Sequence, residues 1–515
     1  MKLTTLFFAV LIAGNALSQT APSDSLFNTD QVVTVDFDFG TQDFWTTLTT
    51  NYENDLGETL TADVTITDLT GTRMYYNVEV DLKGNSSYTH PGNKKSFKVD
   101  FNDNIQGQKY HGMAKVHFNN CWNDPTFMRE KIFFDYCQDH GILAPRVSYA
   151  NVSMNGTFWG FYNLVEAVDR DFLDRWVDDD KGNLFKAGDN FGMGGGGGGS
   201  NAEADLKYYG DAAQDYGTRY ELKTNEAEND WTEFIELLDV LNNSTDDVLA
   251  NELPARFEWN GVLRSIAVDN LMGNLDSYIH SARNYYLYHD STTFLWNWIH
   301  WDGNMSFGSY PAQTQNALTL APTYVANNRP LMTKIMGIAD LRTAYLAEYC
   351  DLHTDFTNTY LDPRIDSIAT LIGPHVSADA NKQFTLEQFT ANITGDITVS
   401  GGGPGGSQAL RGLKSFITQR NTSLASSLDC VISSVADAPV LNALHIYPNP
   451  TADVLFIELP KGASMKDLQL TDALGRRVDL RTNGSSVDVS HLPAGLYNLM
   501  LVTGNTPVVT RVEKQ

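Results

Sequence analysis

Alternating apolar and polar positions predict a β-rich region at the start of the chain. Six segments alternate in the way expected of strands with one buried face. The turn Met154-Asn155-Gly156 between the last two indicates a hairpin. The six segments are residues 32–37, 62–66, 76–82, 96–101, 147–152 and 158–165.

One helix with clear end signals interrupts these strands at residues 125–140. Asp124 suits the N-cap, Pro125 suits the first helical position, and Gly141 follows as a C-cap signal. At 100° per residue, Glu130 and Arg129 fall inside the apolar arc of this helix. A charge in that position needs a partner or must reach the rim, because burial of an unpaired charge is unfavourable.

The pattern changes to helical spacing from about residue 229 to 435, with a strand and turn at 299–307. The predicted helices are residues 231–241, 250–272, 332–353 and 410–428. From about residue 441 the chain returns to short strands separated by turns, which predicts a small β-sandwich. The sequence therefore predicts an α+β protein with a β-rich part at about 25–190, a mainly helical part at about 200–435 and a C-terminal all-β module.

Two glycine-rich stretches, Gly194–Gly199 and Gly401–Gly406, separate these elements. The first lacks a preceding strand and a following Lys-Ser/Thr pair, so it does not fit a phosphate-binding P-loop. Both stretches are predicted to be flexible loops.

Composition narrows the possible functions. The 515 residues are 42% hydrophobic, which excludes a mainly disordered chain, and the net charge is −27. So acidic a surface argues against nucleic-acid binding and against a basic attachment to anionic lipid. Beyond the N-terminus there is no apolar run long enough for a transmembrane span.

The N-terminus is predicted to be a secretory signal, residues 1–18. Lys2 precedes a short apolar stretch, and Ala16-Leu17-Ser18 forms a small-x-small cleavage site. A buried N-terminal helix is the alternative. Export would permit disulfides, and four cysteines allow three pairings that the sequence does not distinguish: Cys121, Cys137, Cys350 and Cys430.

Two groups of residues could carry chemistry. In the first, Lys95 would share a strand face with Phe97, Val99 and Phe101, and Glu130 could face it from the helix. A lysine that holds phosphate oxygens and a carboxylate that orients it are what a phosphate-binding lobe needs. The small-residue loop after Lys83, which contains Ser86 and Ser87, could approach an anion, or it could be a plain turn.

The second group lies in residues 269–308, where Asp269, Asp276, Asn284 and Asp302 stand among apolar positions. Asp302 follows an apolar strand and precedes a glycine, so its side chain should emerge at a strand end. Carboxylate and amide oxygens of this kind suit Mg²⁺ or Mn²⁺, which could bridge the phosphates of a nucleotide. Ordinary turn chemistry is the alternative for each residue alone.

The order of motifs resembles the CotH kinase family, that is, the spore coat protein H family, over about residues 30–430. The blocks that carry the resemblance are KGNSS, NKKSFKVDF, DPTFMREKIFFDYC, VSMNGTFWGFYNLVEAVDRDFL, GNLFKA, NLDSYIHSARNYYLY, IHWDGNMSFG and LKSFITQRNTSL. The resemblance implies an atypical two-lobed protein-kinase-like fold, ATP with a divalent metal, and phosphoryl transfer to Ser or Thr of a protein substrate.

Carried over by motif, Lys95 would be the phosphate-binding lysine and Glu130 its partner. Glu166 lies in the segment 163–169, which resembles the hinge that lines the adenine. Asp276 would accept the proton of the acceptor hydroxyl. Asn284 and Asp302 would hold the metal, while Lys83, Ser86 and Ser87 belong to the anion-binding loop.

Three positions depart from the family pattern. Asn284 stands eight residues after Asp276, whereas the catalytic-loop Asn of ordinary kinases stands five after the Asp. The metal block has Asn304 where a second carboxylate is common, which weakens metal binding or leaves one ion. Lys83 stands where the family often has Arg.

The tail, from about residue 441 to 515, resembles a type A sorting domain of the type IX secretion system. The blocks are IYPNP, LQLTDALGRR, VDVSHLPAGLYNLML and TRVEKQ. The resemblance implies a Bacteroidetes-like host, handling by the type IX machinery, a secreted or cell-surface location, and removal of the tail at secretion. The combined expectation is a secreted kinase, and the alternatives are a pseudokinase acting as an adhesion or scaffold module and, less well supported, a carbohydrate-associated surface protein.

Overall fold

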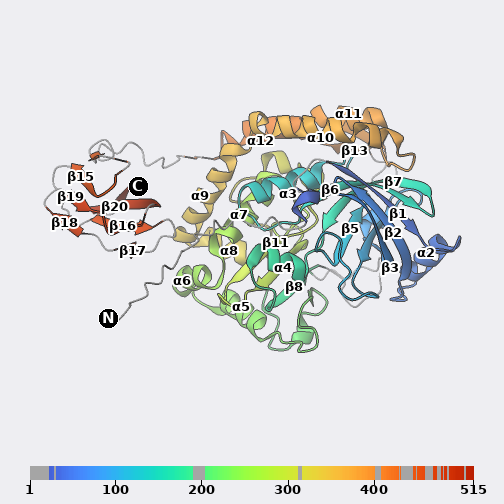
Figure 1. Cartoon of the computed structure of the whole chain (residues 1–515). Coiled ribbons are helices and arrows are strands. Elements are labelled where there is room, and N and C mark those ends of the chain that lie inside the picture. The colour runs from blue at the N-terminus through green and yellow to red at the C-terminus, as the bar shows by residue number, and fades with distance from the viewer. Residues whose placement is uncertain are drawn as a thin grey trace, which may run out of the picture. The chain divides into compact units, whose positions relative to one another are not determined.

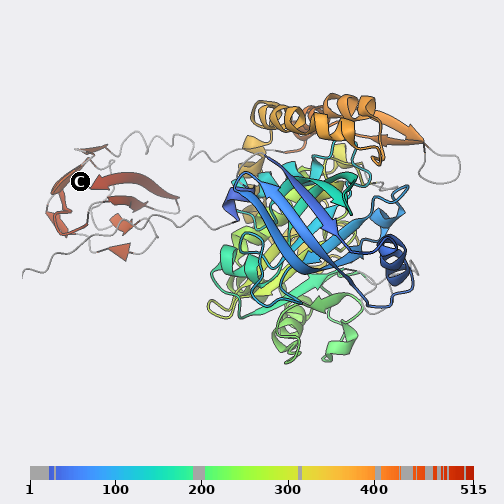
Figure 2. The same cartoon turned by 45° about the vertical axis from the view of Figure 1, so that its right-hand side comes forward.

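The computed structural model of the chain divides into two compact units, residues 1–429 and residues 430–515 (Figures 1 and 2). In the first unit the structure describes residues 23–27, 31–188, 203–310, 316–400 and 407–428. In the second it describes residues 430, 445–447, 449, 451–458, 468–472, 477–478, 481–483, 486–493, 495–503 and 506–514. The predicted signal peptide and both glycine-rich loops lie outside the described residues.

Seven strands of the first unit close into a barrel in the order β1-β2-β3-β4-β5-β7-β6. Parallel pairing between β1 and β6 closes it, and the other neighbours pair antiparallel. The strands are β1 (Val32–Asp38), β2 (Leu60–Asp68), β3 (Gly71–Lys83), β4 (Ser96–Asp100), β5 (Lys115–Asn119), β6 (Val147–Met154) and β7 (Thr157–Glu166). The short helices α1 (Asp24–Phe27) and α2 (Phe44–Glu53) accompany them.

Alternate side chains of these strands fill the barrel interior. Val80 and Leu82 of β3 are buried there with Phe97 and Val99 of β4. Because successive side chains of a strand point to opposite faces, the residues between them form a polar outer face on the barrel. That outer face positions the site described below.

A second sheet, in the order β11-β10-β8-β9, is antiparallel throughout. Its strands are β8 (Asn183–Ala187), β9 (Tyr220–Leu222), β10 (Tyr285–His289) and β11 (Trp296–His300). One face, with Phe185 and Leu287, belongs to the large hydrophobic core of the unit. The other face, with Leu184 and Tyr286, packs with α4 (Arg170–Val177).

Helices make up most of the remaining first unit. Figures 1 and 2 show α10 to α12 lying across one side of it, next to α3 and the strands β6 and β7. The bounds are α3 (Arg129–Asp139), α5 (Thr232–Asn243), α6 (Asp246–Arg256), α7 (Trp259–Leu271), α8 (Pro330–Gly337), α9 (Ala339–Asp355), α10 (Asn358–Ala378), α11 (Leu386–Thr394) and α12 (Leu413–Leu424), with the hairpin β12 (Ile397–Ser400) and β13 (Ser407–Leu410) between the last two.

Three predicted helices have different bounds in the structure. The helix expected at 125–140 begins only at Arg129, because Phe127 has a left-handed backbone with φ 59°. The helix expected at 250–272 is two helices, since Phe257 is extended and Glu258 caps α7 by accepting a hydrogen bond from the Gly261 N–H. The helix expected at 332–353 is interrupted by the extended residue Ile338.

The second unit has two four-stranded antiparallel sheets, β14-β15-β19-β18 and β17-β16-β20-β21. Leu455, Leu470 and Leu499, from both sheets, belong to one buried cluster. The strands are β14 (His445–Tyr447), β15 (Val454–Glu458), β16 (Leu468–Asp472), β17 (Arg477–Val478), β18 (Arg481–Asn483), β19 (Ser486–Asp488), β20 (Gly495–Thr503) and β21 (Thr506–Lys514).

No helix in the described ranges is both long and apolar enough to cross a membrane. Cys350 and Cys430 are disulfide-bonded, whereas Cys121 and Cys137 are buried free thiols.

Candidate functional site

The site is a cavity of about 470 Å³ between the outer face of the barrel and the second sheet. The barrel contributes the outward-pointing side chains of β3, β4 and β5, and α3 contributes Glu130. The second sheet contributes Lys186 of β8, Tyr286 of β10, and Trp301 with Asp302 directly after β11. The barrel side chains at this wall are Lys83, Ser96, Lys98, Lys115, His117 and Asn119.

Lys83 lines the cavity together with the carboxylates of Asp302 and Glu130. It is the last residue of β3 and alternates with the buried Leu82, so it points outward. Burial lowers the pKa of Lys83 to about 8, while the nearby Asp302 and Glu130 act to raise it. Its ammonium also lies 5.1 Å from the centre of the Trp301 ring.

Lys95 does not take the position expected of it. Its ammonium donates hydrogen bonds to the backbone carbonyls of Tyr88 and His90, at 2.7 Å each, and it is not among the residues that line the cavity. The expectation relied on the apolar face of the strand at 96–101. That face points into the closed barrel, so the cavity lies on the opposite, polar face of the strand. The expected pairing of Lys95 with Glu130 therefore does not form.

Glu130 lies in the first turn of α3 with its carboxylate held by two amides. Asn119 Nδ2 donates to both carboxylate oxygens at 3.0 Å, and Asn163 Nδ2 donates to one at 3.3 Å. Burial raises the pKa of Glu130, and the Asn119 hydrogen bonds and Lys83 oppose that rise. The carboxylate is therefore fixed before any ligand enters.

Asp302 is presented by a strained turn at the end of β11. Its backbone is left-handed with φ 55°, which is uncommon for a residue other than glycine. A Cβ on Gly303 would lie 2.6 Å from Phe133, so only glycine fits beneath it. Burial and the neighbouring Glu130 raise the pKa of Asp302 to about 6, while Lys83 and Lys186 oppose the rise.

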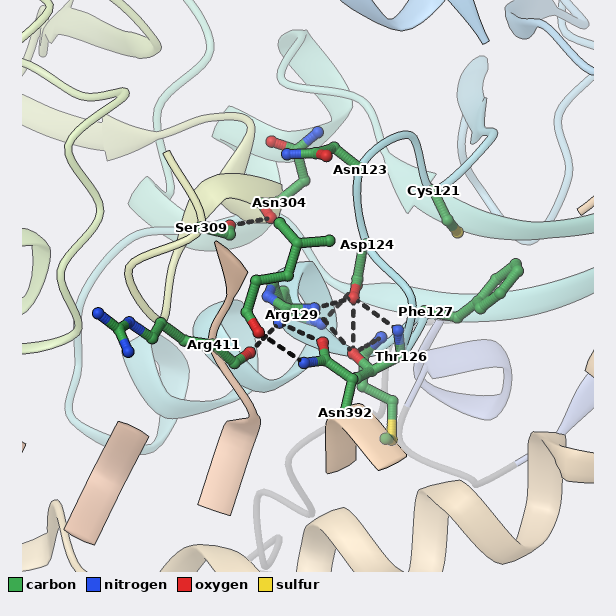
Figure 3. Close-up of polar contacts among 12 residues, drawn as sticks. Cys121, Asn123, Asp124, Thr126, Phe127, Arg129, Asn304, Ser309, Asn392 and Arg411 are labelled. Carbon is green, nitrogen blue, oxygen red and sulfur yellow. Dashed lines mark hydrogen bonds and ion pairs between the residues drawn. The ribbon is translucent and has the colours of Figure 1, made fainter. Parts of the chain in front are cut away.

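The loop that leads into α3 is anchored by Asp124 and Arg129 (Figure 3). Asp124 accepts hydrogen bonds from the backbone N–H groups of Thr126 and Arg129, both at 2.9 Å, and forms an ion pair with the Arg129 guanidinium. The same guanidinium donates to Asn392 Oδ1 at 2.7 Å and to the Arg411 carbonyl at 2.5 Å. Helices near the end of the unit therefore help to fix the helix that carries Glu130.

Part of the anion-binding loop predicted after Lys83 lines the cavity. Gly84 has φ 109°, and a Cβ there would lie 2.1 Å from Ser87 Oγ. Gly84 and Ser87 line the cavity, whereas Ser86 does not. Glu166 also lies outside the lining; its carboxylate is paired with Arg146 at 2.5 Å in a buried ion pair.

Asp276 and Asn284 lie in the segment before β10 and are not among the described residues that line the cavity. Asn284 Nδ2 donates to the backbone carbonyl of Asp276 at 2.7 Å, and Ser281 Oγ donates to the Asp276 carboxylate at 3.0 Å. The pairing of Tyr285 with His300 nevertheless places Asn284 next to the strand end that carries Asp302.

Several cavity residues were not selected from the sequence. His117 lines the wall with a buried Nδ1 that has no hydrogen-bond partner, and burial holds its pKa well below the usual range. Lys186, Trp301 and Asp169 line it as well. Burial raises the pKa of Asp169 to about 7. His117 and Lys186 could have been found in the sequence as polar positions that alternate with apolar ones along a strand.

The cavity carries charges of both signs. Five lysines line it together with six carboxylates: Lys83, Lys98, Lys115, Lys186 and Lys223, and Asp124, Glu130, Asp169, Glu221, Glu226 and Asp302. An anion accompanied by a divalent cation complements both sets of charges.

The cavity offers oxygen donors that a divalent metal could use. Within the described residues no group of three or more His, Cys, Asp or Glu side chains could hold a metal by itself. Asp302 and Asn304 do supply a carboxylate and an amide to the cavity. This set fits Mg²⁺, which is usually bound by one or two carboxylates together with substrate phosphates and water.

Comparisons with known proteins match two parts of the chain to families. A family model described as "CotH kinase protein" matches residues 80–424, and one described as "Secretion system C-terminal sorting domain" matches residues 445–514. "Inner spore coat protein H" from Bacillus subtilis (strain 168) is 28% identical over 234 residues, which are 45% of this chain and 59% of that protein. The chain thus spans less than two thirds of that relative.

Among solved structures, a HipA, HipB and operator DNA complex from Shewanella oneidensis MR-1 matches with a TM-score of 0.26 and 13% identity. The match covers 61% of this chain and 57% of the other, and so low a score does not establish a shared fold. The C-terminal sorting domain, handled by type IX secretion, indicates that the protein is secreted to the cell surface or the extracellular space.

Proposed function

Since the chain belongs to the CotH kinase protein family, we propose that it is a secreted kinase that transfers the γ-phosphoryl group of ATP to Ser or Thr of a protein substrate, with Mg²⁺ or Mn²⁺. The barrel would be the nucleotide-binding lobe and the helical part the second lobe of a protein-kinase-like fold. The proposal includes Asp276 as the group that accepts the proton of the acceptor hydroxyl.

The observation that carries the proposal is the position of Lys83 against Glu130 and Asp302 in one cavity. In phosphoryl transfer most of the catalysis is positioning and charge stabilisation, which needs a lysine on the phosphates and a carboxylate on the metal. Lys83 would hold phosphate oxygens. Glu130, fixed by Asn119 and Asn163, would orient Lys83.

A divalent ion would be held by Asp302 and the phosphates, with Asn304 within the same lining. When bound, it would neutralise the charge that develops on the phosphoryl oxygens. The nearby Lys83 and Lys186 favour the ionised form of Asp302, which is the form that binds a cation.

A pseudokinase that acts as an adhesion or scaffold module is the second candidate. Two observations favour it: Asp276 does not line the cavity in the described residues, and Asn304 replaces a second carboxylate in the metal turn. Such a module would need neither transfer nor a proton acceptor.

The test is incubation of the purified full chain with labelled ATP, Mg²⁺ or Mn²⁺ and a mixture of surface proteins, followed by detection of label on protein. Lys83→Met and Asp302→Asn should each lower transfer by about 10²-fold or more, as expected for the loss of one electrostatic contact to the reacting group. Lys95→Met is the matched control and should transfer at the wild-type rate, because its ammonium binds backbone carbonyls outside the cavity.

Two outcomes would overturn the proposal. No transfer by the wild type under these conditions would favour the scaffold function. Transfer that is lost in Lys95→Met but kept in Lys83→Met would show that the cavity described here is not where the donor binds.

A further inference from the structure

A second half-buried lysine lines the cavity from the wall opposite Lys83. Lys186 is near the middle of β8, where it pairs with Tyr286 of β10 on one side and Glu221 of β9 on the other. Its neighbours Phe185 and Ala187 point into the hydrophobic core, so Lys186 points the opposite way, into the cavity. The two lysines thus come from different sheets.

Trp301 is near both ammonium groups. Lys83 Nζ is 5.1 Å and Lys186 Nζ is 6.0 Å from the centre of its ring, within the range of cation–π attraction. Burial lowers the pKa of both lysines, and the charge of Lys186 acts in the same direction on Lys83. Carboxylates act on both lysines, Asp302 and Glu130 on Lys83 and Glu221 on Lys186. An anion with several charges that enters the cavity can contact both ammonium groups at once.

The other three lysines that line the cavity are more exposed than Lys83 and Lys186. Lys98 pairs with Asp81 at 3.0 Å, Lys115 with Asp100 at 3.1 Å, and Lys223 with Glu221 at 3.0 Å. Their side chains are 50%, 52% and 36% exposed. Ion pairs this exposed are weak, and their lysines are less suited to hold a ligand in a fixed place.

We propose that Lys186 and Lys83 form a two-lysine clamp that grips the polyphosphate chain of the donor from both walls, so that Lys186 selects di- and triphosphates over monophosphates. This inference rests on the proposed function, because it assigns a role within the same donor site. Lys186 contacts phosphate in this arrangement, beside the ring of Trp301.

The experiment measures binding of the purified full chain by calorimetry, with Mg²⁺ present, to ATP, ADP, adenosine and inorganic tripolyphosphate. Lys186→Met removes the charge and keeps most of the aliphatic stem. It should weaken tripolyphosphate and ATP by about tenfold or more, as expected for one charge-assisted contact, ADP less, and adenosine not at all. Lys181→Met is the matched control, since Lys181 lies just before β8 and outside the cavity lining with a 74% exposed side chain, and this variant should stay within about twofold of the wild type.

Lys186→Arg should keep most of the tripolyphosphate affinity, and this rescue separates loss of charge from loss of structure. Wild-type affinity for tripolyphosphate in Lys186→Met would overturn the clamp, and so would an equal loss for adenosine, which would indicate general damage to the cavity. Phosphoryl transfer with an unchanged KM for ATP in Lys186→Met would overturn the clamp and leave the kinase proposal standing. Lys186-dependent tripolyphosphate binding without any phosphoryl transfer would support the clamp and overturn the kinase proposal.

Discussion

A buried ion pair between Lys94 and Asp379 should be a main link between the barrel and the C-terminal helices. Lys94 precedes β4 and Asp379 follows α10, and their Nζ and Oδ2 atoms are 2.6 Å apart. Both side chains are 0% exposed. Asp379 also accepts hydrogen bonds from the backbone N–H groups of Phe161 at 3.1 Å and Asn381 at 2.8 Å.

The loss of stability in each variant depends on which charge or hydrogen-bonding group remains buried without its partner. Asp379→Asn keeps an acceptor oxygen for one of the two backbone donors, because Phe161 and Asn381 bind different carboxylate oxygens, and it leaves the Lys94 ammonium buried without an opposite charge. Breaking a buried pair in this way lowers the free energy of unfolding by about 3 to 5 kcal/mol. Lys94→Met should lower it less, by about 2 to 3 kcal/mol, because the Asp379 carboxylate retains two backbone hydrogen bonds.

The assay is urea unfolding of the full chain, followed by tryptophan fluorescence. All nine tryptophans lie at residues 45–301, so the signal reports on the first unit alone. In the double variant Lys94→Met/Asp379→Asn no unpaired charge remains. It should therefore be more stable than Asp379→Asn, and the two single effects should fail to add by about 2 kcal/mol or more. Additive losses would refute the view that the two residues act as one pair.

Three further predictions concern the cavity. The pKa of Asp169 is about 7 in the folded protein, whereas its ordinary value is 3.8. Between pH 4 and 7 the folded state therefore binds more protons at Asp169 than the unfolded state does. Stability should therefore fall as pH rises from 5 to 7, by about 2 kcal/mol more in the wild type than in Asp169→Asn, as followed by urea unfolding at each pH. Gly303→Ala would place its Cβ 2.6 Å from Phe133 and should lower the free energy of unfolding by about 1 to 3 kcal/mol, whereas Gly337→Ala, with nothing within 4 Å of its Cβ, should not. Asp276→Asn should lower phosphoryl transfer by about 10² to 10⁴ with unchanged ATP affinity, and a wild-type rate in that variant would exclude Asp276 as the proton acceptor.

The sequence could predict the strands and part of the site, because both follow from local patterns. Alternation identifies strands, and the apolar arc of a helix with a charge inside it singles out Glu130. Asp302 could be predicted because a carboxylate between an apolar strand and a glycine should emerge at a strand end. Each of these signals depends on residues that are close together in the chain.

The choice between Lys83 and Lys95 could not be made from local patterns. Alternation divides a strand into two faces, but closure of the barrel depends on pairing β1 with β6, which lies more than a hundred residues further along. Once the barrel closes, its apolar face is fully used inside, and the cavity lies on the polar face. Lys95, which was expected among apolar positions, therefore does not line the cavity, whereas Lys83 on the polar face does.

The lysines of the cavity also bear on the choice between a kinase and a scaffold. A surface that only adheres to a partner gains little from Lys83, Lys186 and Glu130 in a cavity, since each group loses hydration there. Under the kinase proposal, a donor with several phosphate charges would restore that loss for the lysines but oppose the carboxylates, and a divalent ion on Asp302 would resolve the opposition. Polyphosphate and metal would then each favour the binding of the other. That dependence of each ligand on the other is expected of a site that binds a metal–nucleotide complex. It supports the kinase proposal more strongly than the position of Asp276 outside the cavity lining counts against it.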